Sequence, residues 1–474
     1  MFPCAARRWR PAVFRDNTSD ALLVLMTALA NAGDVPSHKM FADSLTAKLY
    51  SNDNECSSAL GVSMCFGLVY PGADGDCAQQ IKSTLRFPDT ATQTALVWGP
   101  TTDRIMKAYD GKCTSESGGT CLAKNPTIEI ANSVWMNGGD TGTEYKMTSE
   151  YMNIVGNVSQ SIDFKAANAA SLVNAWCSEK THGLIPTILN EGPIDGDLVA
   201  VNAIYLNATW LNTFEESKTN EDAFYINSDR TQARASKAHF MHMVEDLPYV
   251  GLNKFQLLQL PYTASSLSML IALPRHSDET VVSSADVLDA VHSGSLKSTR
   301  MAVSLPKFRF ESTFSDSLEL ALKALGMVRP FEGGFFGLLE NKELFVSSII
   351  QKTFINVFEK GTEAAAVTAL QMKITSVPTQ EPDPILFMAD HPFQFWIYDS
   401  SEDVVLFEGR VGDPGIVDGS SSNSQKVHKD SDFWEAGFNT QAKLDGRTAD
   451  SEASTCTLTL VSFASVFFVA GMSL

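Results

Sequence analysis

Residues 359–374 read EKGTEAAAVTALQMKI, and this is the most informative segment of the chain. Its even positions pass from Thr362 through small alanines to Leu370 and Met372, while its odd positions include Glu363 and Lys373. A period of two is typical of a strand with one buried face and one solvent face. The pattern therefore predicts a strand that is able to join a sheet.

The residues that follow predict an exposed loop. Residues 376–384 read SVPTQEPDP, with three prolines in a polar context. Proline removes a backbone donor and fixes φ, so such a segment fits poorly inside a sheet. An ordinary strand followed by a long connection would explain the segment if it stood alone.

The rest of the chain up to Pro414 predicts one α+β domain. Helical periodicity occurs at residues 41–50, 59–70, 151–158, 167–180 and 314–325. Strand-like runs occur at residues 127–136, 198–210, 256–261, 268–273, 301–310, 345–358, 393–398 and 404–411. Early helices and later strands favour antiparallel sheets that carry a helical layer.

Seven sequence blocks follow one another in an order typical of a known family. The hinge block consists of Glu359, Lys360, Gly361, Thr362, Glu363, Ala364, Ala365, Ala366, Val367 and Thr368. The other blocks are residues 72–81, 176–185, 202–210, 305–308, 389–393 and 407–414. Together they resemble the serpin family of serine protease inhibitors over almost all of residues 38–414.

The resemblance implies a serpin fold, with a large antiparallel-dominated central sheet, further sheets, a helical layer and an exposed reactive-centre loop. It also implies suicide inhibition: a protease attacks the loop, forms an acyl-enzyme, and is trapped when the hinge inserts as an extra strand. The small side chains of residues 364–366 and the backbone freedom of Gly361 suit that insertion. The target expected is a serine protease, with a cysteine protease as a second candidate. The alternative is a non-inhibitory serpin-fold binding or storage protein.

Two reactive bonds remain open. Counting fourteen residues on from Gly361, as the family spacing does, places the bond at Thr375–Ser376, which favours an elastase-like or other small-residue protease. Lys373 is the only Lys or Arg between Gly361 and Pro392, so a trypsin-like protease would cut at Lys373–Ile374.

The chain departs from the family pattern at positions where the sheet opens. The resemblance places Ser58, Asn202 and Gln351 at the shutter beneath the central sheet and Trp210 at the breach at its top. The family's usual Ser-Pro-x-Ser-Ile is SALGV at residues 58–62, and a frequent His is Gln351. We expect Asn202 to hydrogen-bond Gln351. Val367 is also bulkier than the usual alanine.

Composition excludes several classes of function. The chain has 474 residues, with 36 Lys and Arg against 55 Asp and Glu, for a net charge of −19. Such an acidic surface repels phosphate backbones, so nucleic acid is not an expected partner. Nucleotide-binding loops, nucleophile elbows and zinc-protease motifs are missing from the sequence. We expect a monomer that is not an enzyme and needs no cofactor or metal.

Both ends of the chain predict processing segments. Residues 1–32 resemble a signal peptide, or alternatively an amphipathic helix, before a serpin domain at residues 33–414. Residues 415–455 predict a flexible polar linker. Residues 456–474 predict a glycolipid-anchor signal, a membrane-anchoring helix or a buried helix. The expected location is extracellular, either secreted or anchored at the cell surface.

Covalent modifications are expected at three residues. Cys113 and Cys121 bracket a short polar hairpin and predict a disulfide in an oxidising compartment. Asn157 lies in a glycosylation sequence near the end of a predicted helix. Cys65 and Cys177, among apolar residues, predict buried free thiols.

Overall fold

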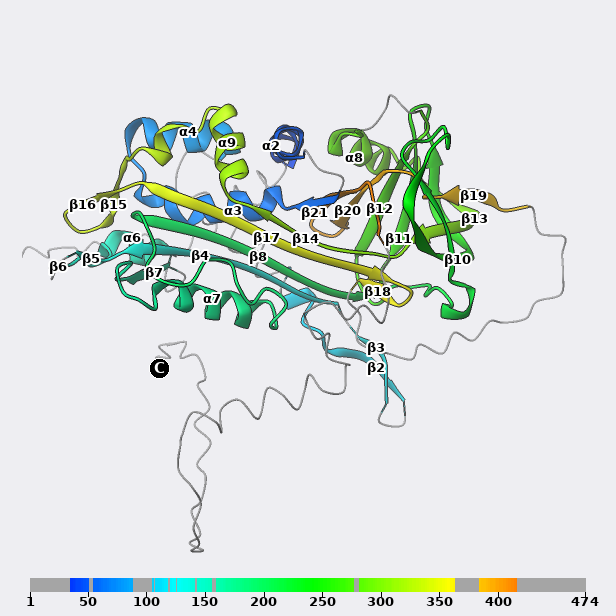
Figure 1. Cartoon of the computed structure of the whole chain (residues 1–474), viewed down its shortest axis with the longest axis horizontal. Coiled ribbons are helices and arrows are strands. Elements are labelled where there is room, and N and C mark those ends of the chain that lie inside the picture. Colours follow the sequence, from blue (N-terminus) through cyan, green and yellow to red (C-terminus); the bar gives the residue numbers. More distant parts are fainter. Residues whose placement is uncertain are drawn as a thin grey trace, which may run out of the picture. The chain divides into compact units, whose positions relative to one another are not determined.

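The computed structural model combines mainly antiparallel sheets with helices packed on them, which confirms an α+β fold (Figure 1). The structure describes residues 35–50, 54–87, 105, 107–117, 120–124, 126–140, 143–155, 159–276, 281–362 and 383–415. The expected signal peptide (1–32), the C-terminal tail (456–474), Asn157 and all of the expected linker except Gly415 lie outside these residues.

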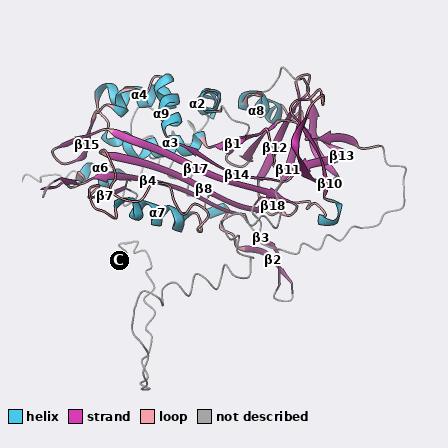
Figure 2. Cartoon of the chain, in the orientation of Figure 1, coloured by secondary structure: helices cyan, strands magenta, loops and turns pink. Residues whose placement is uncertain are grey.

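A six-stranded sheet carries the start of the hinge (Figures 1 and 2). Its strands, in spatial order, are β14 (Phe308–Phe314), β17 (Val346–Phe358), β18 (Gly361–Thr362), β8 (Leu198–Thr209), β4 (Thr127–Asn137) and β7 (Ser159–Ile162). β8 reads LVAVNAIYLNAT and is buried along most of its length. Such a nearly continuous apolar run is typical of a strand that is covered on both faces.

Helices cover both faces of this sheet (Figure 2). The helices on this sheet are α2 (Val35–Leu49), α3 (Ala59–Val69), α4 (Gly75–Leu85), α6 (Ser149–Val155), α7 (Ala169–Lys180) and α9 (Asp316–Ala324), whereas α8 (Ser284–His292) packs on the other large sheet. Val199 and Val201 of β8 pack with α7, whereas Ala200 packs with α3 on the opposite side, as alternation along a strand requires. Among the described residues, no helix is long and apolar enough to cross a membrane.

A nine-stranded sheet forms the other large layer. Its strands are β1 (Asn54–Ser57), β21 (Val404–Val411), β20 (Phe393–Asp399), β12 (Leu267–Pro274), β11 (Phe255–Pro261), β10 (Ala233–Gly251), β13 (Lys297–Pro306) and β19 (Ile385–Met388), with β9 (Asn220–Tyr225) paired to β10. Three hairpins complete the sheets: β2 (Cys113–Ser117) with β3 (Thr120–Lys124), β5 (Gly139–Asp140) with β6 (Thr143–Glu144), and β15 (Phe335–Leu339) with β16 (Lys342–Leu344).

The prediction of a single strand at residues 301–310 is wrong. Residues 301–310 form parts of two strands, because β13 ends at Pro306 and belongs to the nine-stranded sheet, while β14 begins at Phe308 in the six-stranded sheet. The backbone N–H of Lys307, between them, donates to the carbonyl of His239 at 2.8 Å. A period-two pattern continues across such a crossing, so periodicity alone does not reveal it.

Candidate functional site: the hinge, its slot and the far end of the loop

The structure describes the two flanks of the expected reactive loop. Glu359 to Thr362 lie in the described part of the hinge, and Asp383 onward in the described part beyond the loop. Residues 363–382, which include Glu363, Ala364, Ala365, Ala366, Val367, Thr368, Lys373, Ile374, Thr375 and Ser376, lie outside it.

The first hinge residues already lie between two strands of the six-stranded sheet. In β18, Thr362 pairs with Val357 of β17 and with Ala208 of β8, and Gly361 pairs with their neighbours (Figure 1). A Cβ at Gly361 would lie 2.0 Å from the carbonyl oxygen of Ala208. Since both groups are backbone, only glycine fits at this position without a shift of the strand.

We call the region below β18, between residues 205–207 of β8 and residues 354–356 of β17, the slot. β8 and β17 run parallel and pair with each other from Leu198 and Val346 as far as Ile204 and Thr353. Beyond this ladder, residues 205–207 and 354–356 pair on their outer edges with β4 and β14. The described residues contain no pairing between these two stretches. Among the described residues, the inner edges of β8 and β17 have no strand partner at this end.

Trp210 closes the top of the slot. Its indole N–H donates to the carbonyl of Phe358 at 3.0 Å, and its ring stacks on Tyr262 with 4.5 Å between centroids and 11° between planes. The hydroxyl of Tyr262 lies 2.7 Å from the hydroxyl of Thr362. Sequence reasoning did not identify Tyr262, which directly follows β11 and forms an isolated β-bridge with Trp210.

A buried carboxylate fixes the start of the hinge. Glu359 is 5% exposed and accepts hydrogen bonds from Lys307 Nζ at 3.0 Å and from the Thr219 hydroxyl at 2.7 Å. Burial alone would raise the pKa of Glu359, but these hydrogen bonds outweigh it, and the pKa of this carboxyl lies below its ordinary value. Glu359 therefore stays ionised and paired.

The residues expected at the shutter meet beneath the sheet. Gln351, fully buried, donates from Nε2 to Asn202 Oδ1 and to the Ser58 carbonyl, both at 2.8 Å, and accepts from the Ser58 N–H at 2.9 Å. The expected Asn202–Gln351 hydrogen bond is therefore present. Gly61 makes room for it, because a Cβ there would lie 2.3 Å from Asn202 Oδ1.

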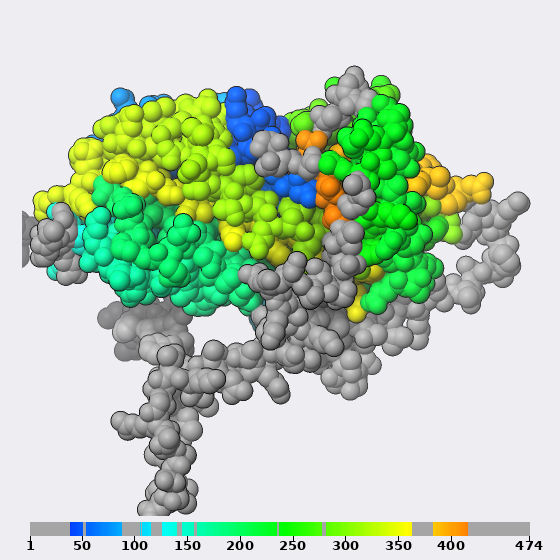
Figure 3. Space-filling model, viewed as in Figure 1, coloured from blue at the N-terminus to red at the C-terminus, as the bar shows by residue number. Residues whose placement is uncertain are grey.

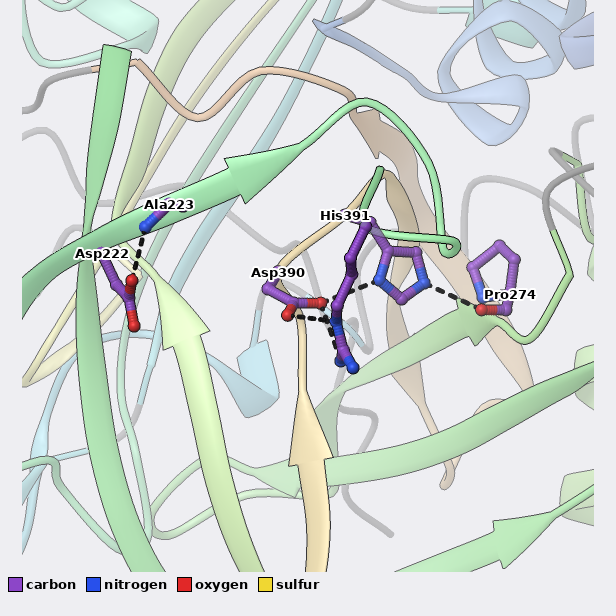
Figure 4. Close-up of polar contacts among 6 residues, drawn as sticks. Asp222, Ala223, Pro274, Asp390 and His391 are labelled. Carbon is purple, nitrogen blue, oxygen red and sulfur yellow. Dashed lines mark hydrogen bonds and ion pairs between the residues drawn. The ribbon is translucent and has the colours of Figure 1, made fainter. Parts of the chain in front are cut away.

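The far end of the loop enters a different sheet. β19 is an edge strand, parallel to β13, with Ile385 and Leu386 exposed at the surface shown in amber in Figure 3. Figure 4 shows the residues that follow it. Asp390 accepts two hydrogen bonds from Arg230 and lies 2.9 Å from His391 Nδ1.

Asp390 and His391 are buried, whereas the side chain of Arg230 is about half exposed. His391 Nε2 lies 2.8 Å from the Pro274 carbonyl, so each ring nitrogen faces an oxygen acceptor (Figure 4). Burial alone would raise the pKa of Asp390, but hydrogen bonds from His391 and Arg230 outweigh it, and the pKa lies below its ordinary value. Charged hydrogen bonds therefore hold the segment after β19.

The cysteines lie in two different environments. Cys113 is disulfide-bonded, and the strand carrying Cys121 pairs with its own, but the side chain of Cys121 lies outside the described residues. The pairing of these two residues therefore stays a prediction. Cys65 and Cys177 are buried free thiols, as predicted. The described residues contain no cluster that could hold a metal ion.

Comparisons with known proteins agree with this geometry. Residues 36–414 match the family model described as Serpin (serine protease inhibitor). Serpin-ZXA of Oryza sativa subsp. japonica is 32% identical over 383 residues, covering 76% of this chain and 90% of that protein. An uncharacterized serpin-like protein of Thermococcus kodakarensis is 30% identical over 389 residues, covering 78% and 84%.

Solved structures share the fold. Serpin48 of the insect Tenebrio molitor, described as a highly specific serpin, has a TM-score of 0.60 and 26% identity, covering 80% of this chain and 98% of its own. Human thyroxine-binding globulin in complex with its hormone has a TM-score of 0.64 and 21% identity, covering 82% and 100%. With a family match over most of its length and a buried hinge between two parallel strands, this chain belongs to the serpin family.

Proposed function

We propose that this protein is an inhibitory serpin that traps a serine protease irreversibly by inserting its cleaved loop into the six-stranded sheet. The observation that carries the proposal is the position of β18 at the mouth of the slot between β8 and β17. A strand that starts there needs no rearrangement at its first two residues.

The register of β18 supports insertion of the rest of the hinge. Continued antiparallel from Thr362, residues 363–365 would stand opposite residues 205–207 and 354–356, which pair only on their outer edges among the described residues. Ala366 would be the first residue to separate a paired position, Ile204 from Thr353. Residues 372 and 373 would reach Leu198 and Val346, where the ladder ends. If the loop inserted almost as far as the expected reactive bond, its strand would separate β8 from β17 along their whole ladder and would pair with both of them.

The alternating side chains support the same direction of entry. Thr362 is 3% exposed and faces Tyr262, so even-numbered residues would face the same buried layer. The alanines at 364 and 366 present little bulk to that layer, and Leu370 and Met372 would add apolar burial. Each backbone group that gains a partner would add about 1 kcal/mol, which supplies a driving force for trapping.

The target follows from the loop sequence. Cleavage at Thr375–Ser376 suits a protease that accepts small residues, and cleavage at Lys373–Ile374 suits a trypsin-like one. Incubation with a panel of serine and cysteine proteases should yield a complex that survives SDS, and mass spectrometry of the released fragment should find Ser376 at its N-terminus. A new N-terminus at Ile374 would move the reactive bond to Lys373. Failure of every protease to form a complex would refute inhibition.

A non-inhibitory binding or storage role is the competing proposal. The fold is shared with a structure of thyroxine-binding globulin, so the fold alone does not decide between the two. In a non-inhibitory protein, cleavage of the loop should leave the melting temperature unchanged. The inner edges of residues 205–207 and 354–356 have no strand partner in the part of the chain that the structure describes, which favours the inhibitory role.

An oxidising compartment is part of the proposal. The disulfide at Cys113 supports it, since disulfides persist mainly in secreted and cell-surface proteins. Phospholipase treatment of intact cells should release the protein if residues 456–474 are a glycolipid signal. Recovery of a soluble protein with an intact C-terminus would contradict an anchor.

A further inference from the structure

We propose that the hydroxyl of Tyr262 is a positioning group that holds Thr362 in the sheet of the uncleaved protein and thereby favours trapping over simple hydrolysis. This inference rests on the proposed function, but neither the sequence blocks nor the family match points to Tyr262. The argument starts from the contacts around one buried hydrogen bond.

The hydrogen bond joins two side chains that have little access to water. Tyr262 is 1% exposed and Thr362 is 3% exposed, with 2.7 Å between their oxygens. Burial raises the pKa of Tyr262, so the phenol remains protonated and available as a donor. Removing one hydroxyl would leave the other buried without this partner, which is more costly than removing both.

The position of Tyr262 is fixed independently of Thr362. Its ring stacks on Trp210, and the N–H of the next residue, Thr263, donates to the carbonyl of Thr209 at 2.8 Å. Both contacts attach the turn after β11 to the end of β8. The phenol is therefore a rigid support, and Thr362 is the group that can leave it.

Thr362 lies at the junction between the part of the hinge that pairs with the sheet and the reactive loop. On one side, Gly361 and Thr362 pair with β8 and β17, and the backbone N–H of Trp210 donates to the Lys360 carbonyl at 2.9 Å. On the other side begins the loop that a protease would attack. After cleavage, insertion of the loop competes with hydrolysis of the acyl-enzyme. A hinge whose first residues already pair with β8 and β17 should therefore insert faster, and more of the protease should be trapped.

The test compares Tyr262→Phe with the wild type in two measurements on the full chain. Phenylalanine keeps the ring that stacks on Trp210 and removes only the hydroxyl. Amide hydrogen exchange of a peptide covering residues 358–362 should become about fivefold faster, the factor expected for one lost hydrogen bond. The number of inhibitor molecules consumed per trapped protease should rise by a similar factor.

Two further variants separate positioning from general destabilisation. Adding Thr362→Val to Tyr262→Phe should raise neither measurement beyond its value in Tyr262→Phe alone, because both substitutions remove the same hydrogen bond. Tyr151→Phe is the matched control: Tyr151 is also 1% exposed, and its hydroxyl donates to the Leu68 carbonyl at 2.9 Å near β7. This variant should lower the melting temperature without changing either measurement. Should Tyr262→Phe fail to fold, Thr362→Val alone is expected to show the same two increases.

The outcomes distinguish the inference from the proposed function. Unchanged exchange in Tyr262→Phe, or faster exchange with unchanged consumption per trapped protease, would overturn the inference while leaving inhibition intact. An equal effect of Tyr151→Phe would also overturn it. If the wild type itself formed no complexes, the proposed function would fail, and exchange would still decide whether the hydroxyl holds the hinge.

Discussion

The residues that border the reactive loop on its two sides are held by different kinds of interaction, while the charged pair of Glu359 and Lys307 on the N-terminal side lies before Gly361. At the N-terminal flank, Gly361 and Thr362 lie between two strands, held by backbone pairing and one neutral hydroxyl pair. At the C-terminal flank, the residues after β19 are held by a carboxylate, a guanidinium and an imidazole, with Asp390 and His391 almost fully buried. Neutral contacts can be exchanged for similar ones as a strand moves, whereas buried charges lose their partners if they separate.

This contrast indicates which end of the cleaved loop moves. The N-terminal flank faces a slot whose inner edges have no strand partner among the described residues, so its continuation would gain partners on insertion. The C-terminal flank already has its partners and would lose them. We infer that the cleaved loop enters the six-stranded sheet from the hinge side while β19 stays in the nine-stranded sheet.

Blocking the moving end should have the largest effect. In the inserted strand, the side chain of Ala366 would share the buried face of Thr362, so Ala366→Arg would bury a guanidinium without a partner. The cost of about 3 to 5 kcal/mol should abolish SDS-stable complexes and convert the protein into a substrate. The native melting temperature should hardly change, because folding does not require this residue to enter the sheet.

The neighbouring residue provides a control for Ala366→Arg. Ala365→Arg would place its side chain on the opposite face, beside the half-exposed Tyr205 and Phe354. We expect that variant to retain most of its complexes. Normal trapping by Ala366→Arg would mean that the hinge does not insert in the register of β18.

Disrupting the fixed end should lower stability instead. Asp390→Ala leaves His391 buried beside Arg230 without their shared carboxylate, at a cost of about 3 kcal/mol in the free energy of unfolding by urea at pH 7. Asp222→Ala, an exposed carboxylate nearby in Figure 4, should cost almost nothing. Equal stability of the two variants would remove the distinction between the flanks.

The pH dependence of Asp390 follows from its lowered pKa. A carboxyl whose folded pKa lies below the ordinary 3.8 stabilises the fold above that pH and loses its contribution as the pH falls through the folded value. The difference in stability between wild type and Asp390→Ala should therefore be full at pH 7 and shrink below about pH 4.

A smaller effect is expected where the hinge begins. Glu359→Gln removes the charge that pairs with Lys307 and should lower the free energy of unfolding by about 2 kcal/mol at pH 7. Because the folded pKa of Glu359 lies below the ordinary 4.5, this difference should persist above pH 4.5 and diminish as the pH falls below it. A difference that grows on acidification would contradict this assignment.

The smallest effect should come from the shutter. Gln351→His can keep the bond to Asn202 and the bond from the Ser58 N–H, but a neutral imidazole lacks the second donor for the Ser58 carbonyl. We expect a loss of about 1 kcal/mol in the free energy of unfolding. Thermal melts of the two proteins at pH 8 would measure it, and a more stable variant would contradict the hydrogen bonds described here.

Some of this architecture could be predicted from the sequence. The hinge block, the buried run of β8 and the Asn202–Gln351 contact depend on residue type and spacing, which the sequence displays directly. Periodicity could not reveal the division of residues 301–310 between two sheets. Nor did it reveal β10, where the consecutive residues Phe240 and Met241 are both buried and interrupt a simple alternation of buried and exposed side chains.

The interactions between distant residues required the structure. Tyr262 meets Thr362 across one hundred positions of sequence, and Arg230 meets Asp390 across 160. Neither a tyrosine directly after a strand nor an arginine in a polar loop is unusual enough to attract attention. Likewise, no local pattern reveals that residues 205–207 and 354–356 do not pair with each other in the described part of the chain, because this depends on where β18 lies between β8 and β17.

The most direct test of strand insertion is the melting temperature of the protein before and after its loop is cut. A protease that cleaves between residues 363 and 382 without being trapped would supply the cut form. If the hinge continues into the slot in the register of β18, the cut form should melt well above the intact protein, since the inserted strand gains backbone pairing on both edges. A cut form that melts at or below the temperature of the intact protein would contradict insertion and, with it, the proposed mechanism of inhibition.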